Sequence, residues 1–311
     1  SNLIKVAGYC AGVDDSDNAN GDETLLLDGV TITLQGGYDP APAINGTGPI
    51  DWNTPTGATT VLDALSGGRV AYITATADAT FADLTLRNGY VMNANGGAVF
   101  NAGTLTLDNS SVQSSTADEG DGGGVYNDSG TLIVQNNSLI GGDRTLGEGN
   151  RALCTACAGD VGAGGGIASR NSGGTLTIDN STISGNEATI LGAGVLDVTG
   201  NLTVQNSSVI GGTLGTTGNV AQVGAGLYMA DATISDSTIS GNDGQGFYVG
   251  GISTLTNVDI TGNVAGFNAG FRAEGGTLTV QDSLIANNRA TGDMTQSGFG
   301  GGFGVGGVPT T

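Results

Sequence analysis

The residues best suited to chemistry stand near the start of the chain, in the segment "GVDDSDNANGDE" at 12–23. Hard oxygen ligands on a tight loop are what calcium takes, so calcium is the one cofactor that the sequence predicts, and none is otherwise required. The spacing is not that of an EF-hand, because Ala19 occupies the fifth position counted from Asp15, and a solvated acidic loop is the alternative. The candidate ligands are Asp14, Asp15, Asp17, Asp22 and Glu23.

A second, weaker acidic cluster lies in "TADEGDGGG", with Asp118, Glu119 and Asp121. Paired carboxylates could also hydrolyse glycans, but the N-T-D, D-D and R-I-K set of pectinases is absent from the repeats described below. The chain has no histidine, which excludes the usual Ser-His-Asp and Cys-His nucleophile pairs. We therefore expect a protein that is not an enzyme, with a polysaccharide lyase or hydrolase as the least favoured alternative.

The three cysteines are Cys10, Cys154 and Cys157, and the last two form a C-T-A-C motif. A zinc site would need a second pair of ligands, and a thioredoxin-type motif would need a βαβ setting. The motif favours a local structural disulfide between Cys154 and Cys157, with free or intermolecular thiols as the alternative. Cys10 is left over.

The balance of charge limits the partners. The formal net charge is −21 at pH 7, so we expect no nucleic-acid binding. No apolar run approaches the roughly 18 residues of a membrane-spanning helix, so we expect no membrane insertion. The chain starts at Ser1 rather than methionine, which is typical of an exported product, and we expect a secreted or cell-surface location.

These residues must be positioned by a repeat. The stretch "GTLTIDNSTISGN" at 174–186 recurs in eight copies, and the anchor residues Leu84 and Leu105 are 21 positions apart. Each copy contains two short strands of period two around an Asn/Asp corner, then a glycine-rich approach to a third strand. Such a unit predicts an all-β parallel β-helix, or solenoid, of about eight or more three-strand coils. The predicted boundaries are an N-terminal cap and first coils at 1–78, the repeat β-helix at 79–290 and a glycine-rich coil or tail at 291–311.

The third strand predicts both an interior stack and an outer face. Its inward positions are Val99, Val125, Ile167, Val195, Leu227, Phe247, Phe271 and Phe303. Its outward neighbours include the candidate contact stripe for a second subunit or for sugar rings, unless long loops cover it. The stripe comprises Phe100, Tyr126, Leu196, Tyr228 and Tyr248.

Corner asparagines and the C-terminal tail have predicted structural roles. The recurrent asparagines and serines of the corners, with the asparagines Asn109, Asn137, Asn180 and Asn206, are expected to stack in ladders that satisfy buried backbone groups. The tail "SGFGGGFGVGGVPTT" either serves as an assembly segment on a neighbouring copy or folds back as one more coil. Its candidate contact residues are Phe299, Phe303, Val305 and Val308.

The motifs "ISGN" at 183 and 239, "ITGN" at 260, "IANN" at 285 and the following "GGAV" or "GGGV" are similar to the repeats of polymorphic outer-membrane-type proteins. Isoleucine replaces the phenylalanine of that family. The resemblance implies a right-handed parallel β-helix on the bacterial surface with adhesive or structural roles, and it supplies no catalytic residue.

The sequence as a whole predicts an extracellular structural protein that self-assembles into filaments through end-to-end or tail-mediated contacts. The alternative is a cell-surface adhesin or carbohydrate-binding β-helix, with glycans or another cell surface as its partner.

Overall fold

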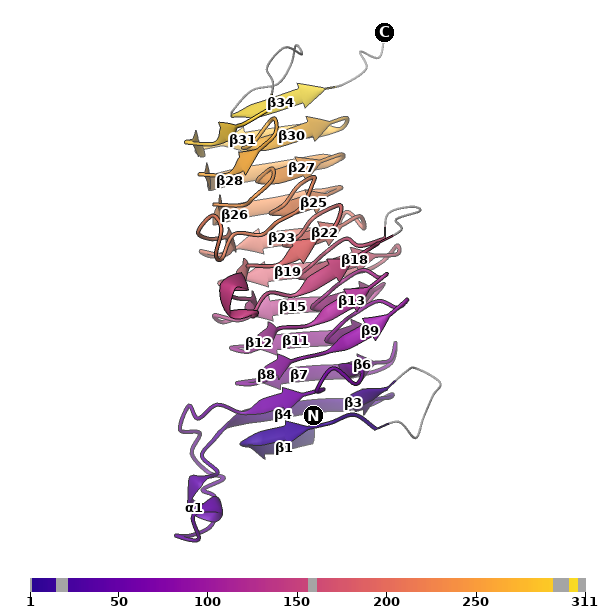
Figure 1. Cartoon of the computed structure of the whole chain (residues 1–311), viewed down its shortest axis with the longest axis vertical. Coiled ribbons are helices and arrows are strands. Elements are labelled where there is room, and N and C mark those ends of the chain that lie inside the picture. The colour runs from indigo at the N-terminus through magenta and orange to yellow at the C-terminus, as the bar shows by residue number, and fades with distance from the viewer. Residues whose placement is uncertain (1, 15–21, 156–160, 293–301, 307–311) are drawn as a thin grey trace.

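The computed structural model describes residues 2–14, 22–155, 161–292 and 302–306. They form a parallel β-helix, a rod of stacked coils with the N-terminal coils at one end and β34 at the other (Figure 1). Strands account for 51% of the chain and helices for 2%. The ladder of third strands contains ten strands, so the described part of the chain has ten coils.

The first face of the rod is an 18-stranded parallel sheet, which consists of two ladders joined at the Asn/Asp corner. The first ladder contains β1 (Asn2–Ala7), β4 (Thr31–Tyr38), β7 (Asp78–Ala82), β11 (Thr104–Asp108), β15 (Thr131–Gln135), β19 (Thr175–Asp179), β23 (Leu202–Gln205), β26 (Ala232–Ser240), β28 (Ile252–Thr261) and β31 (Thr277–Gln281). The second contains β2 (Tyr9–Ala11), β5 (Val61–Asp63), β8 (Thr85–Arg87), β12 (Ser111–Gln113), β16 (Leu139–Gly141), β20 (Thr182–Ser184), β24 (Val209–Gly211) and β32 (Leu284–Ala286). β26 and β28 run through both ladders.

A short ladder that the sequence did not predict lies in the variable region of the coils. It contains β9 (Tyr90–Met92), β13 (Thr116–Asp118), β17 (Arg151–Leu153), β21 (Glu187–Ala188), β29 (Val264–Ala265) and β33 (Arg289–Ala290). Parallel bridges through Val220 and Asp243 connect β21 to β29. Complete coils therefore carry a fourth strand or bridge in addition to the three that the repeat predicts.

The remaining face is a 10-stranded parallel sheet of third strands. It contains β3 (Glu23–Leu27), β6 (Arg69–Ile73), β10 (Val99–Asn101), β14 (Val125–Asp128), β18 (Ile167–Arg170), β22 (Val195–Asp197), β25 (Leu227–Met229), β27 (Phe247–Val249), β30 (Phe271–Glu274) and β34 (Phe303–Gly306). The pairing register confirms the predicted inward stack from Val99 to Phe303 and extends it to Ala71 and Leu25.

The strands β1 to β6 form two coils in register with the repeat, although their residues lack its motif. β1 pairs with β4, β2 with β5 and β3 with β6. A helix, α1 (Ala41–Ile44), protrudes from the loop between β4 and β5 at the N-terminal end of the rod (Figure 1). The N-terminal segment thus continues the solenoid.

The glycine-rich approach to the third strand is fixed by close packing between coils. Gly122 has φ +67°, and a Cβ there would lie 2.6 Å from the carbonyl oxygen of Val125. A Cβ on Gly123 would lie 2.3 Å from the carbonyl oxygen of Arg151 in the next coil. Only glycine fits at both positions.

Buried asparagines form a ladder inside the rod. The Oδ1 atom of Asn219 accepts a hydrogen bond from the backbone N–H of Asn186 at 3.0 Å, and Asn219 Nδ2 donates to the carbonyl of Ile183 at 3.0 Å. The same pattern repeats along the rod and satisfies buried backbone groups at this corner of each coil. Its members are Asn150, Asn186, Asn219, Asn242, Asn263 and Asn288.

The prediction that Asn109, Asn137, Asn180 and Asn206 satisfy buried groups was wrong. All four are exposed and have positive φ, between 45° and 64°. They occupy the left-handed backbone conformation that the corner requires, which asparagine tolerates better than most residues. Serines beside them take the predicted role: Ser138 Oγ accepts from the Ser110 N–H and donates to the Leu107 carbonyl.

Candidate functional surfaces and hollows

The acidic segment near the N-terminus is partly outside the described residues, which omit Asp15 and Asp17. Asp14 and Glu23 form an antiparallel backbone bridge, and the Glu23 side chain is buried. Burial lowers the pKa of Arg69, whereas electrostatic interactions with Tyr72 and Glu23 oppose this shift. The Glu23 carboxylate therefore interacts with the Arg69 guanidinium. Across the ranges that the structure describes, no group of three or more possible ligands could hold a metal. The calcium site stays a prediction.

The second acidic cluster is divided among separate partners. Asp118 accepts a hydrogen bond from the Tyr90 hydroxyl, and Glu119 accepts one from the Thr155 N–H. Asp121 forms an ion pair with Arg170 at 2.8 Å. Each carboxylate therefore serves a local contact.

The cysteines occupy different environments. Cys154 is disulfide-bonded, and Cys157 lies outside the described residues. Cys10 is a free thiol on β2, opposite Leu62, and therefore heads an inward column of aliphatic side chains.

The outward column of the 10-stranded sheet is a stacked aromatic ladder. The Tyr72 and Phe100 rings lie 4.8 Å apart, and the Tyr228 and Tyr248 rings lie 4.5 Å apart, both nearly parallel. Arg69 covers the Tyr72 and Phe100 group, and the Arg272 guanidinium lies 5.8 Å from the Tyr248 ring. Stacked neighbours and arginines thus occupy the ring faces that a sugar would need.

The predicted contact stripe is interrupted in the middle. Leu196 is 0% exposed and Tyr126 is 5% exposed, because the column packs with Ala163 and Leu191 from the adjoining loops. Phe100, Tyr228 and Tyr248 are half-buried. Burial and a hydrogen bond to Glu274 raise the pKa of Tyr248 to about 12, so its hydroxyl stays protonated. At Tyr126 and Leu196 the alternative of coverage by loops therefore holds, and a contact role for Phe100, Tyr228 and Tyr248 stays a prediction.

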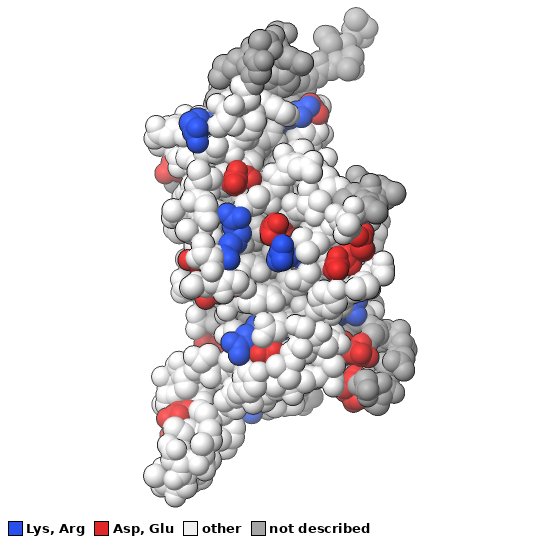
Figure 2. All heavy atoms as spheres, viewed as in Figure 1, with Lys and Arg blue, Asp and Glu red and all other residues white. Residues whose placement is uncertain are grey.

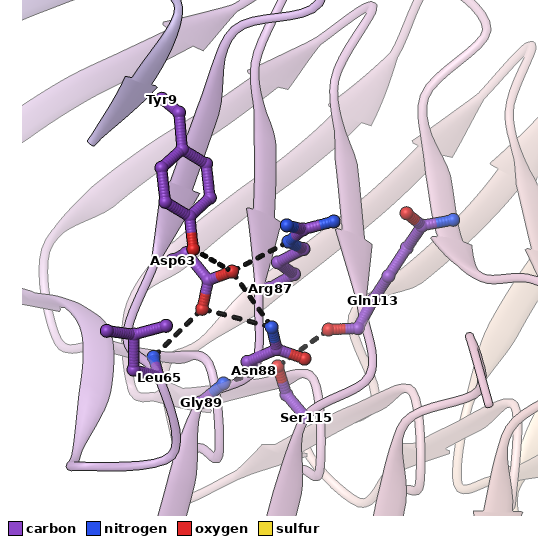
Figure 3. Close-up of polar contacts among 8 residues, drawn as sticks. All are labelled: Tyr9, Asp63, Leu65, Arg87, Asn88, Gly89, Gln113 and Ser115. Carbon is purple, nitrogen blue, oxygen red and sulfur yellow. Dashed lines mark hydrogen bonds and ion pairs between the residues drawn. The ribbon is translucent and has the colours of Figure 1, made fainter. Parts of the chain in front are cut away.

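The most connected carboxylate is Asp63, which joins three coils (Figure 3). It accepts hydrogen bonds from the Tyr9 hydroxyl at 2.9 Å, from Arg87 Nε at 2.8 Å and from Asn88 Nδ2. Burial opposes its ionisation, but the Leu65 N–H and these side-chain donors outweigh it and hold the pKa of Asp63 below its ordinary value. Such a carboxylate is a structural anchor.

The surface of the described residues includes two hollows of interest. One, of about 470 Å³, is lined by Ser114, Thr116, Arg144, Gly147, Gly149, Arg151, Gly185 and Glu187. The other, of about 630 Å³, lies on the outer face of the 18-stranded sheet and contains Thr177, Thr203, Thr233 and Thr254, which occupy one column in register. Sequence reasoning missed both. The recurring T-x-T of the first strand was a signal for the second.

The end coils expose side chains that would otherwise be interior. At the N-terminal end Ile4, which is 48% exposed, begins a column that ends at Val280, which is 37% exposed. Phe303 stacks on Phe271 at 5.3 Å and is 55% exposed. Each end therefore presents an apolar layer within a set of strand edges.

The predicted tail residues divide between described and undescribed positions. Phe299 and Val308 lie outside the described residues. Phe303 and Val305 lie on β34, which pairs with Phe271 and Ala273 of its own chain. Residues 303–306 therefore fold back as one more coil, and an assembly role for the tail stays a prediction.

With this geometry established, comparison with known proteins adds no identity: no family model, curated protein or solved structure matches the chain. The resemblance to polymorphic outer-membrane-type repeats stays a prediction from motifs. The helices among the described residues, α1 and η1 (Arg144–Leu146), have four and three residues, too few to cross a bilayer.

Proposed function

We propose that the protein is a non-enzymatic, extracellular structural β-helix whose copies join end to end. The observation that carries this proposal is the match between the two end layers: columns that begin at Ile4, Cys10 and Leu25 end at Val280, Ile285 and Phe303. A second copy stacked on the first would continue every column and pair the free strand edges. The disulfide at Cys154 agrees with an oxidising location.

The free energies of burial and of association predict an assembly that depends on protein concentration. Half-exposed apolar side chains contribute about 1 kcal/mol each on burial. Three end residues are half-exposed, namely Ile4, Val280 and Phe303, and Cys10, Leu25 and Ile285 are already partly buried. Their burial and the paired edges oppose an association cost of ~4–15 kcal/mol. The net charge of −21 adds repulsion that salt screens. We therefore expect longer particles as protein and salt concentrations rise.

The direct test is electron microscopy and light scattering of the purified chain at increasing protein and sodium chloride concentrations. Filaments whose length grows with both are the expected result. An Ile4→Asp variant should stay monomeric, because it places a charge in the joint. A particle that remains a single rod under all conditions would contradict the proposal.

Cysteine cross-linking tests the register of the joint. In a continued column, Cys10 of one copy lies above position 285 of the next at the strand spacing of ~4.8 Å, within disulfide range. An Ile285→Cys variant should therefore give oxidised multimers. Val280→Cys, which ends the column of Ile4, is the matched control. Equal cross-linking of the two variants would reject this register.

A carbohydrate-binding role is the second candidate, favoured by the threonine hollow. Among the described residues, no hydrogen bond to protein occupies the hydroxyls of Thr177, Thr203, Thr233 or Thr254, so they could bind the hydroxyls of a neutral glycan. Soluble linear glucans should then bind the wild type, and Thr203→Val with Thr233→Val should bind more weakly. Thr106→Val, outside the hollow in the same column, is the control.

A further inference from the structure

The hollow that contains Arg144 and Arg151 lies between a corner loop and the short fourth-strand ladder. η1 supplies Arg144, and β13, β17 and β21 place Thr116, Arg151 and Glu187 side by side in register. Its volume of about 470 Å³ falls within the range of small-molecule sites. The face drawn in Figure 2 is mostly uncharged, and basic atoms gather near its middle.

Arg144 forms no ion pair in the described part of the chain, although its charge helps to lower the pKa of the adjacent Asp143 carboxyl, after the hydrogen bonds from Thr145. Its Nε atom is buried and has no hydrogen-bond acceptor there. A buried N–H group without an acceptor is costly, and an anionic oxygen in the hollow is the partner that the terminal N–H groups of the half-buried side chain fit best. The side chain also packs across Gly149, since a Cβ on that glycine would lie 3.1 Å from Arg144 Cγ.

The carboxylates around Arg144 are engaged by other donors. Asp143 accepts from the backbone N–H and the hydroxyl of Thr145, and Glu148 accepts from the Asp143 N–H. Glu187 accepts from Arg151 Nε at 3.0 Å. That contact uses one edge of the Arg151 guanidinium, whose terminal nitrogens have no hydrogen bond within the described ranges.

Most other arginines of the chain are neutralised locally. Arg87 pairs with Asp63, Arg170 with Asp121 and Arg272 with Glu274. Arg144, which has no such ion pair, is therefore an exception in a chain of net charge −21, and the ion-paired Arg151 and the hydroxyls of Ser114 and Thr116 line the same hollow.

We infer that this hollow binds the oxyanion group of a small acidic ligand, with the size and hydroxyls of a single sugar acid. Arg144 supplies the planar fork that matches a carboxylate or a sulfate, and Arg151 supplies a second positive charge. Ser114 and Thr116 can donate to or accept from the ligand's hydroxyls. The inference is independent of the proposed end-to-end assembly.

The test is calorimetric or NMR titration of the full chain at ~0.15 M salt, where long-range repulsion by the net charge is screened. Glucuronate, sulfate and glucose are the three probes. Glucuronate should bind, sulfate should bind more weakly and glucose should not bind. Arg144→Gln should weaken glucuronate binding at least tenfold. Arg289→Gln makes the same charge change on exposed β33, outside the hollow, and should leave binding unchanged.

Urea unfolding of both variants provides the folding control, and Arg144→Lys, which keeps the charge but loses the fork, should have intermediate affinity. Equal binding of sulfate and glucuronate would keep the oxyanion assignment and overturn the sugar-acid part. Absence of binding by either anion, or equal loss in the Arg289 variant, would overturn the inference.

Discussion

Asparagines inside the rod and asparagines at its exposed corner recur in the same coils, and they have different structural roles. Asn219 is buried, and its amide joins two neighbouring coils through hydrogen bonds to backbone and side chain. Asn180 is exposed with φ +45°, and its contact to Asn137 is 3.4 Å long. The interior amide is needed for its hydrogen bonds, and the corner amide for the backbone shape that it tolerates.

The largest effect is expected for Asn219→Ala. The substitution leaves the Ile183 carbonyl and the Asn186 N–H buried without partners, at ~1–3 kcal/mol each, so the loss of stability should be about 4 kcal/mol. Urea unfolding followed by circular dichroism measures it. A loss below about 1 kcal/mol would show that the ladder is dispensable and would remove the contrast with the corner.

The second prediction concerns Asp63→Asn. The hydrogen-bond donors around this buried carboxylate lower its pKa by more than burial raises it. We expect a loss of about 3 kcal/mol at pH 7, because the Arg87 charge and the Tyr9 hydroxyl lose their anionic partner. The folded pKa of Asp63 lies below the ordinary value of 3.8, so its contribution is present above that pH and is lost as the pH falls through the folded pKa. Unfolding curves between pH 2 and 7 should therefore converge at the acid end.

Asp197 is an interior carboxylate whose pKa shifts in the opposite direction to that of Asp63. Burial raises its pKa against the opposing hydrogen bonds from Thr199, Gly200 and Ser169. A folded pKa above 3.8 favours the native state at low pH, and this stability is lost as the pH rises through the folded value. Asp197→Asn should thus be more stable than wild type at pH 7, by less than the change at Asp63, and should lose that advantage below pH 3.8. A parallel pH dependence of the two proteins would contradict this.

The smallest effect belongs to the corner. Asn180→Ala should cost about 1 kcal/mol, the penalty for a Cβ in left-handed backbone without asparagine's local compensation, whereas Asn180→Gly should be nearly neutral. Thermal unfolding of the pair measures the difference. If glycine were as damaging as alanine, the amide contact rather than the backbone would be what matters.

Local patterns predicted the fold well because they act within one coil. Period two in "GTLTIDN" identified the inward positions, and the glycine pairs identified the third strand. The two N-terminal coils were expected only as a cap and first coils without a register, because their residues pair with the repeat without sharing its motif. The interior ladder did leave a signal, since Asn186, Asn242 and Asn263 are the last residues of the "ISGN" and "ITGN" motifs.

The candidate sites were much harder to predict, because their members come from different coils. The Asp63 network combines residues 9, 63, 87 and 88, and the arginine hollow combines residues from 114 to 187. Which segments become neighbours depends on loop lengths and register, which no single stretch encodes. The burial of Tyr126 and Leu196 in the aromatic stripe likewise depends on packing with the loop residues Ala163 and Leu191.

β26 and β28 pair residue for residue at an offset of 21 positions, from Ala232 opposite Ser253 to Ser240 opposite Thr261. A gene segment that encodes one such unit could be copied or removed in frame, and each neighbour would meet the same edges as before. Every copy would change the length of the rod by one strand spacing, ~4.8 Å. The gene can therefore adjust the reach of this molecule in fixed steps, without a new core or a new fold.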